Sequence, residues 1–75
     1  MKAKYKHEGN DCLIYDQVIC EDNVVVTIRS YKGWFDSLPQ TTTRVCATDS
    51  EARETFMKIC KKFESEHLDC VYKEE

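Results

Sequence analysis

The sequence predicts an α+β fold, in which a small antiparallel β-meander of three to five strands packs on one C-terminal α-helix. Up to about residue 47, apolar and polar side chains alternate with the period of a strand, and from there the apolar side chains recur with the period of a helix. No repeat or linker divides the 75 residues. A chain of this length forms one domain at most, so residues 1–75 are expected to be a single small globular domain.

Four segments before residue 47 have the alternation of strands, and turn-forming residues separate them. Lysines occupy one side of the first segment, which is typical of an edge strand. Asp16 and Gln17 interrupt the second segment, and a β-bulge is expected there. The expected strands cover residues 3–7, 12–20, 24–31 and 41–47, with hairpin turns at 8–11 and 21–23.

One amphipathic helix is expected at about residues 49–66. Thr48 and Glu51 have the spacing of a capping box, in which the threonine hydroxyl accepts the Glu51 amide and the carboxylate reaches back. Five apolar residues then recur at helical spacing along one stripe. They are Ala52, Phe56, Ile59, Cys60 and Phe63. Alternation returns after the helix and predicts a short last strand at 68–72.

The helix stripe requires an apolar floor on the sheet. The side chains expected to supply this floor are Val24, Val26, Ile28 and Val45. A single helix covers one face of a sheet, so the other face is expected to expose an apolar patch, which usually binds a partner. The side chains assigned to that patch are Leu13, Tyr15, Ile19, Val25 and Tyr31. A homodimer that buries this patch is a further expectation.

Charge and composition argue against several classes of partner. Eleven basic and fourteen acidic residues give a net charge of −3, which argues against nucleic acid and against an anionic membrane surface. No stretch of about 18 apolar residues is present, so no membrane span is expected. The charged start of the chain has no apolar segment after it, so we expect no signal peptide and a cytoplasmic location.

The five cysteines predict free thiols, and neither a cofactor nor a metal site is expected. Their number is odd, and a reducing compartment disfavours disulfides. Structural zinc sites use closely spaced pairs of ligands, whereas these cysteines stand 8, 26, 14 and 10 residues apart. The cysteines are Cys12, Cys20, Cys46, Cys60 and Cys70.

The sequence also lacks a catalytic constellation. Cys60 and His67 stand seven positions apart on the expected helix, about 10 Å along its axis, which is too far for a direct hydrogen bond. Gly9 and Gly33 are isolated, so no phosphate-binding loop is present. We therefore expect a protein that is not an enzyme.

The segment 31–38 is the predicted contact surface, because it places large apolar side chains in a turn-rich stretch. Aromatic side chains bury much area at low entropic cost and are favoured anchors of protein interfaces. The alternative is that Trp34 and Phe35 fold back over the open side of the sheet. The predicted partner-binding residues are Tyr31, Lys32, Trp34, Phe35 and Leu38.

These observations predict a small intracellular module that binds or regulates another protein, such as an inhibitor of the kind that phages and mobile elements encode. The alternative is a domain that binds single-stranded nucleic acid, because aromatic and basic side chains alternate near the same segment. That alternative uses Arg29, Tyr31, Trp34 and Arg44. A thiol or metal protein is a further alternative.

Overall fold

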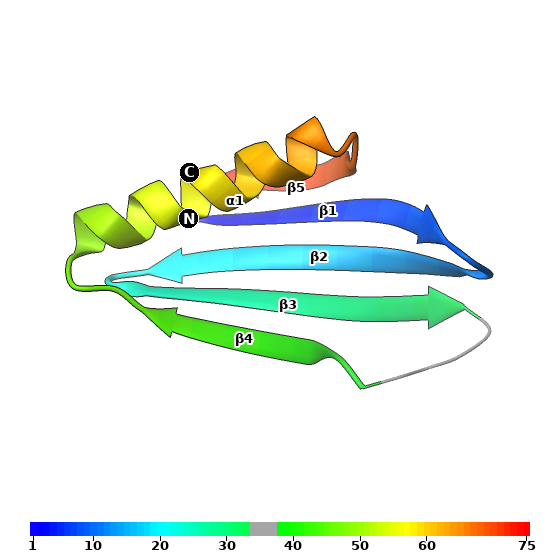
Figure 1. Cartoon of the computed structure of the whole chain (residues 1–75), viewed down its shortest axis with the longest axis horizontal. Helices are drawn as coiled ribbons and strands as arrows, with labels where there is room; N and C mark the ends of the chain where they lie inside the picture. Colours follow the sequence, from blue (N-terminus) through cyan, green and yellow to red (C-terminus); the bar gives the residue numbers. More distant parts are fainter. Residues whose placement is uncertain (34–37) are drawn as a thin grey trace.

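A computed structural model describes residues 1–33 and 38–75 and confirms the α+β class. In these residues five antiparallel strands form one sheet, and one helix packs on it (Figure 1). The elements are β1 (Lys2–Gly9), β2 (Cys12–Glu21), β3 (Val24–Gly33), β4 (Gln40–Val45), α1 (Asp49–Ser65) and β5 (Asp69–Glu74). No helix in these described residues has the length and apolar character that crossing a membrane requires.

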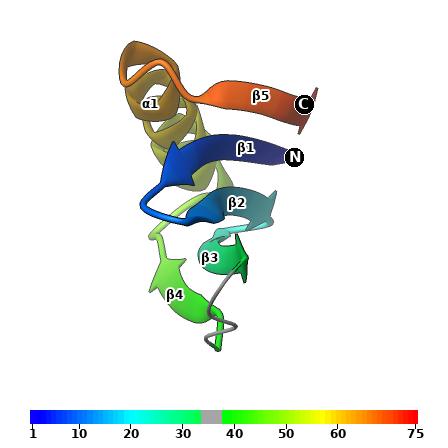
Figure 2. The same cartoon turned by 90° about the vertical axis from the view of Figure 1, so that its right-hand side faces the viewer.

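The strand order across the sheet is β4-β3-β2-β1-β5. The first four strands form a meander, as expected, and β5 returns to pair with β1 at the far edge (Figure 1). Figure 2 shows α1 on one side of the sheet, beside β5, β1 and β2, while β4 lies farther from it. The sheet therefore has a helix-covered face and an open face, and the covered face is itself covered incompletely.

Two hairpin turns connect the three central strands, and a residue with positive φ stands in each. Asp11 has φ 62° and Asp22 has φ 52°, in the left-handed region that aspartate tolerates. The pairing of β2 with both neighbours runs without a register shift, so the expected bulge at Asp16 and Gln17 is wrong. The sheet instead has a register shift between β1 and β5: Lys4 pairs with Tyr72 and Tyr5 with Cys70, which leaves Val71 of β5 as the extra residue.

The start of α1 follows the expected capping box. The Thr48 hydroxyl accepts a hydrogen bond from the amide of Glu51 at 3.1 Å. The Glu51 carboxylate reaches back to accept the amide of Ala47 at 3.2 Å. These bonds satisfy amides that the helix itself leaves unpaired.

The other end of α1 is closed by a left-handed residue that is not glycine. His67 has φ 61°, and its amide donates to the Glu64 carbonyl at 3.1 Å. The Leu68 amide donates to the Phe63 carbonyl, also at 3.1 Å. This pair of bonds forms a Schellman motif, which turns the chain sharply toward β5.

The core lies between α1 and the covered face. Phe56 and Tyr5 are the largest side chains there, and both are fully buried. The Tyr5 ring packs against Phe63, with the ring centroids 5.3 Å apart. The buried apolar set is Ala3, Tyr5, Val18, Cys20, Val25, Cys46, Ala52, Phe56 and Cys60.

The prediction from the sequence exchanged the covered and open faces of β3. Val25 pairs with Cys20 on the covered face and is 2% exposed. Directly paired residues of antiparallel strands point to the same face, so the neighbours of Val25 point to the open face. The expected helix floor is therefore wrong: Val24, Val26, Ile28 and Val45 lie on the open face. Val25 and Tyr31, which were assigned to the open patch, lie on the covered face.

Candidate functional site

The described part of the predicted contact loop does not form one surface. Tyr31 pairs with Ile14 on the helix side of the sheet and is half-buried. Lys32 is exposed and pairs with Leu13, on the open face. Leu38 is 89% exposed, just before β4. Trp34 and Phe35 lie outside the described residues, so their place in this surface stays a prediction.

The open face brings together apolar side chains from β2 and β3. The register places Ile19 directly opposite Val26, with the remaining side chains above and below them in the same two strands. They are half-buried, and no element of the described residues covers them (Figure 2). The apolar residues of this face are Leu13, Tyr15, Ile19, Val24, Val26 and Ile28. Val45 of β4 extends the surface and is 70% exposed.

Lysines from β1 border this apolar surface. Lys4 places its Nζ atom 4.9 Å from the centroid of the Tyr15 ring, and Lys2 places its own 5.9 Å from the Tyr72 ring. Lys2 also lies 3.5 Å from the Glu74 carboxylate. Such exposed contacts add little stability, but they hold positive charge beside the aromatic rings. The open face is thus apolar over β2 and β3. Lys4 and Lys6 add positive charge along β1, whereas Glu74 neutralises Lys2.

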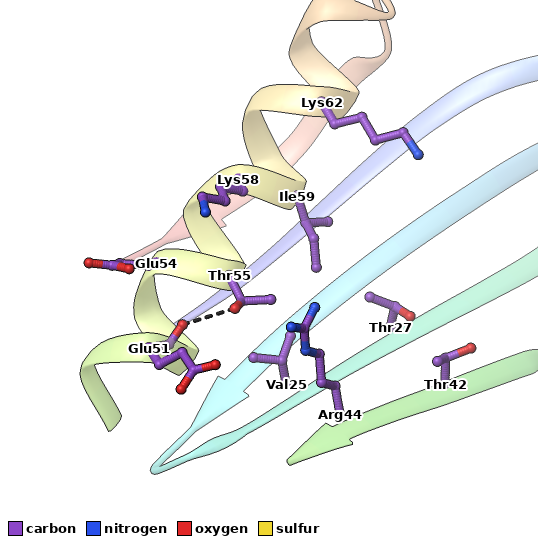
Figure 3. A pocket seen from close by; sticks show the side chains of 10 residues that line it. All are labelled: Val25, Thr27, Thr42, Arg44, Glu51, Glu54, Thr55, Lys58, Ile59 and Lys62. Carbon is purple, nitrogen blue, oxygen red and sulfur yellow. Dashed lines mark hydrogen bonds between the residues drawn. The ribbon is translucent and has the colours of Figure 1, made fainter. Parts of the chain in front are cut away.

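A groove lies on the opposite face, between α1 and the outer strands β3 and β4 (Figure 3). Its volume is about 400 Å³, and Arg44 of β4 and Lys62 of α1 both line it. A second hollow of about 320 Å³ continues it along the helix and shares Thr27, Thr42, Ile59 and Lys62 with the first. Together they form one open channel beside the helix.

A buried carboxylate stands at the end of this channel. Asp16 is 5% exposed, and it accepts two hydrogen bonds from the Arg29 guanidinium at 2.8 and 3.1 Å. These bonds raise the pKa of Arg29 above its ordinary value. His7 places its Nε2 atom 3.7 Å from the same carboxylate. The Arg29 charge is therefore largely neutralised within the sheet, because a buried carboxylate needs such a partner.

The five cysteines, all within the described residues, are free thiols, as expected. Burial raises the pKa of the Cys60 thiol, which disfavours the reactive thiolate. The Tyr5 hydroxyl donates a hydrogen bond to Glu64 at 3.0 Å, which ties β1 to the helix. In the described ranges, no group of three or more His, Cys, Asp or Glu side chains is placed to hold a metal ion.

The residues of the nucleic-acid alternative lie on the covered face where they are described. Arg29, Tyr31 and Arg44 share that side of β3 and β4. The buried Asp16 already holds Arg29, however, so Arg44 is the free cation of this set among the residues that the structure describes. Trp34, the fourth member, lies outside them.

Comparisons of the chain with protein-family models, with curated proteins and with solved structures find no match. The function is therefore argued from the two faces themselves.

Proposed function

We propose that this chain is a non-enzymatic module that binds another protein through the open face of its sheet. The observation that carries the proposal is the pairing of apolar side chains from β2 and β3, centred on Ile19 and Val26, on a face that no described element covers. Contiguous exposed apolar patches on small domains commonly mark interaction surfaces.

The fold does not need these open-face side chains for its core. Phe56, Val18 and Val25 supply that core on the other side of the sheet, where they are almost completely buried. Strand pairing alone requires no apolar residue on the outer side, because polar residues satisfy the alternation of an exposed face equally well. The apolar character of the open face thus supports a role in binding.

The lysines of β1 indicate the chemistry of the partner. Lys2, Lys4 and Lys6 all belong to the side of β1 that points to the open face, where they border the apolar centre. Protein interfaces commonly have an apolar centre and a charged rim whose sign complements that of the partner. The partner surface is accordingly apolar at its centre, with carboxylates where it meets β1. A cytoplasmic regulator that covers a surface of a larger protein would use such a face.

Site-specific crosslinking tests this proposal. A photoreactive amino acid at Thr43, on the open face of β4, should crosslink one protein from a lysate of the source cells, and mass spectrometry should identify it. The same label at Arg53, an exposed residue of α1, should give no such product. Val26→Glu places a charge at the centre of the open face and should abolish the Thr43 product while circular dichroism stays unchanged.

Three results would overturn the proposal. A crosslink from Arg53 alone would move the contact to the helix. A Thr43 product that survives Val26→Glu would show contact without use of the apolar centre. A Thr43 product that joins two copies of this chain would assign the face to self-association, and sedimentation of the unlabelled protein at increasing concentration would then show a dimer.

The predicted loop residues are tested with the same label. Trp34→Ala with Phe35→Ala should weaken the Thr43 product if the loop contributes anchors beside the face. An undiminished product would show that the open face binds without them, which removes Trp34 and Phe35 from the predicted contact residues.

A further inference from the structure

Three cations line the channel between α1 and β3–β4. They are Arg44, Lys58 and Lys62, and within the described ranges none of them has an ion-pair partner. Arg44 extends from β4 toward the helix, and Lys62 extends from the helix over the sheet (Figure 3). Two other basic side chains that face the helix are neutralised: Arg29 by Asp16, and Lys73 by Glu64 at 3.4 Å. Arg44 and Lys62 thus approach one hollow from opposite walls with their charges available.

The carboxylates along the same channel are fewer than its cations. Glu51 is engaged at the helix start, where it accepts the Ala47 amide. The Glu54 side chain points away from the sheet (Figure 3). Asp16 is held by the two bonds from Arg29. Four cations (Arg29, Arg44, Lys58 and Lys62) and three carboxylates (Asp16, Glu51 and Glu54) line the channel. Its net charge is therefore +1, although the whole chain carries a net charge of −3.

The floor of the channel suits a peptide. Ile59 provides apolar contact from the helix, and Thr27 and Thr42 provide hydroxyls along the sheet. The channel follows the helix from Glu51 to Phe63, about 18 Å at the rise of an α-helix. An extended segment of about five or six residues has this length.

We propose that this channel binds an extended acidic segment of a partner protein, with its carboxylates on Arg44 and Lys62 and its small apolar side chains on Ile59. Single-stranded nucleic acid fits less well, because its bases need aromatic platforms. The one aromatic residue in the described lining, Phe63, already packs on Tyr5. The channel and the open face lie on opposite sides of the sheet, so this proposal does not depend on the function proposed above.

Fluorescence anisotropy with defined probes tests the proposal. The probe is a labelled peptide of about six residues in which Glu alternates with Val, which matches the length of the channel. The wild-type protein should bind it saturably, and Arg44→Gln with Lys62→Gln should weaken binding by at least about tenfold, because two charge-assisted contacts are lost. The matched control, Arg53→Gln with Lys61→Gln, removes the same charges from exposed helix positions outside the channel and should change binding less than about twofold.

Each other result contradicts the proposal. Absence of saturable binding by the folded wild type would remove the channel as a peptide site. Equal weakening by both double variants would show attraction to overall charge. A short oligothymidylate that binds more tightly than the peptide, and loses affinity in the channel variant, would assign the channel to nucleic acid. Val26→Glu on the open face should leave peptide binding unchanged, which separates this site from the proposed protein-binding face.

Discussion

The two faces of the sheet are formed by the same strands, but they differ in how deeply their side chains are buried. On the covered face, Val18 and Val25 are at most 2% exposed beneath α1, and the polar Asp16 is buried with Arg29 as its partner. On the open face, the adjacent Ile19 and Val26 are half-buried only by their strand neighbours. The same residue types thus contribute core packing on one side and accessible apolar area on the other.

Because of this difference, the core and the proposed binding surface can be changed separately by single substitutions. Neighbours along a strand point to opposite faces, so Val25 lies in the core and Val26 on the open face although one peptide bond joins them. Substitutions should therefore affect stability on one face and binding on the other, and the following experiments test how complete that separation is.

The largest effect on stability is expected from a substitution in the core between α1 and the sheet. Phe56→Ala removes a fully buried ring between α1 and the sheet. Its lost packing and the remaining cavity should lower the free energy of unfolding by about 3–5 kcal/mol, which approaches the stability of a small domain. Urea denaturation followed by circular dichroism measures this change. Arg53→Ala on the exposed side of α1 is the control and should change it by less than about 0.5 kcal/mol.

Val25 and Val26 allow the two faces of the sheet to be compared with the same substitution. Val25→Ala should cost about 2 kcal/mol, because two buried methyl groups are lost and a cavity remains. Val26→Ala removes the same atoms from a half-buried position and should cost less than about 1 kcal/mol. Both values come from urea midpoints under one set of conditions. Equal costs at the two positions would show that something covers the open face in solution.

Alkaline pH should lower the free energy of unfolding through two groups on the covered face. Burial and the hydrogen bond to Glu64 raise the pKa of Tyr5 above its ordinary value of 10.0, and burial raises the pKa of Cys60 above 9.0. The folded state therefore keeps these protons when the unfolded chain releases them. Their contribution is complete below about pH 9 and is lost as the pH rises through the folded-state values.

The free energy of unfolding, measured in urea between about pH 8 and about pH 11, should therefore fall with increasing pH. Tyr5→Phe should remove the part of this slope that begins near pH 10, and the earlier part due to Cys60 should remain. A slope that Tyr5→Phe leaves unchanged would show that the tyrosine proton is not linked to folding.

The smallest effect is expected where the helix leaves the covered face. His67 has a left-handed backbone that glycine adopts without steric cost. His67→Gly should raise the free energy of unfolding by about 0.5–1 kcal/mol and leave peptide and partner binding unchanged. Thermal denaturation measures the gain. A loss of stability would mean that the imidazole makes contacts that outweigh the backbone strain.

The sequence predicted the elements well because each had a local signal. The capping residues Thr48 and Glu51 located the helix start, and the alternating residues located the strands. The orientation of β3 was wrong because its first residues, Val24, Val25 and Val26, are apolar on both sides. Periodicity separates two faces of such a strand but does not say which of them the helix covers.

One signal in the sequence could have corrected this error. A two-residue turn at Asp22 and Asn23 pairs residues that are equally distant from it, as the structure shows. That rule places Val25 opposite Cys20 and also Asp16 opposite Arg29, which explains a polar residue that had been assigned to a bulge. The channel had no such signal, because Arg44 and Lys62 meet only through the tertiary packing of α1.

The place of β5 beside β1 also has a consequence for synthesis. Lys2 pairs with Glu74, so β1 is synthesised well before the strand that pairs with its outer edge. Until then the edge of β1 opposite β2 is unpaired and can pair with another extended chain. The alternating lysines of β1 carry positive charge, which repels similar strands from this edge while the nascent chain is incomplete. Pairings between such distant positions also favour slow folding, because a long loop must close first.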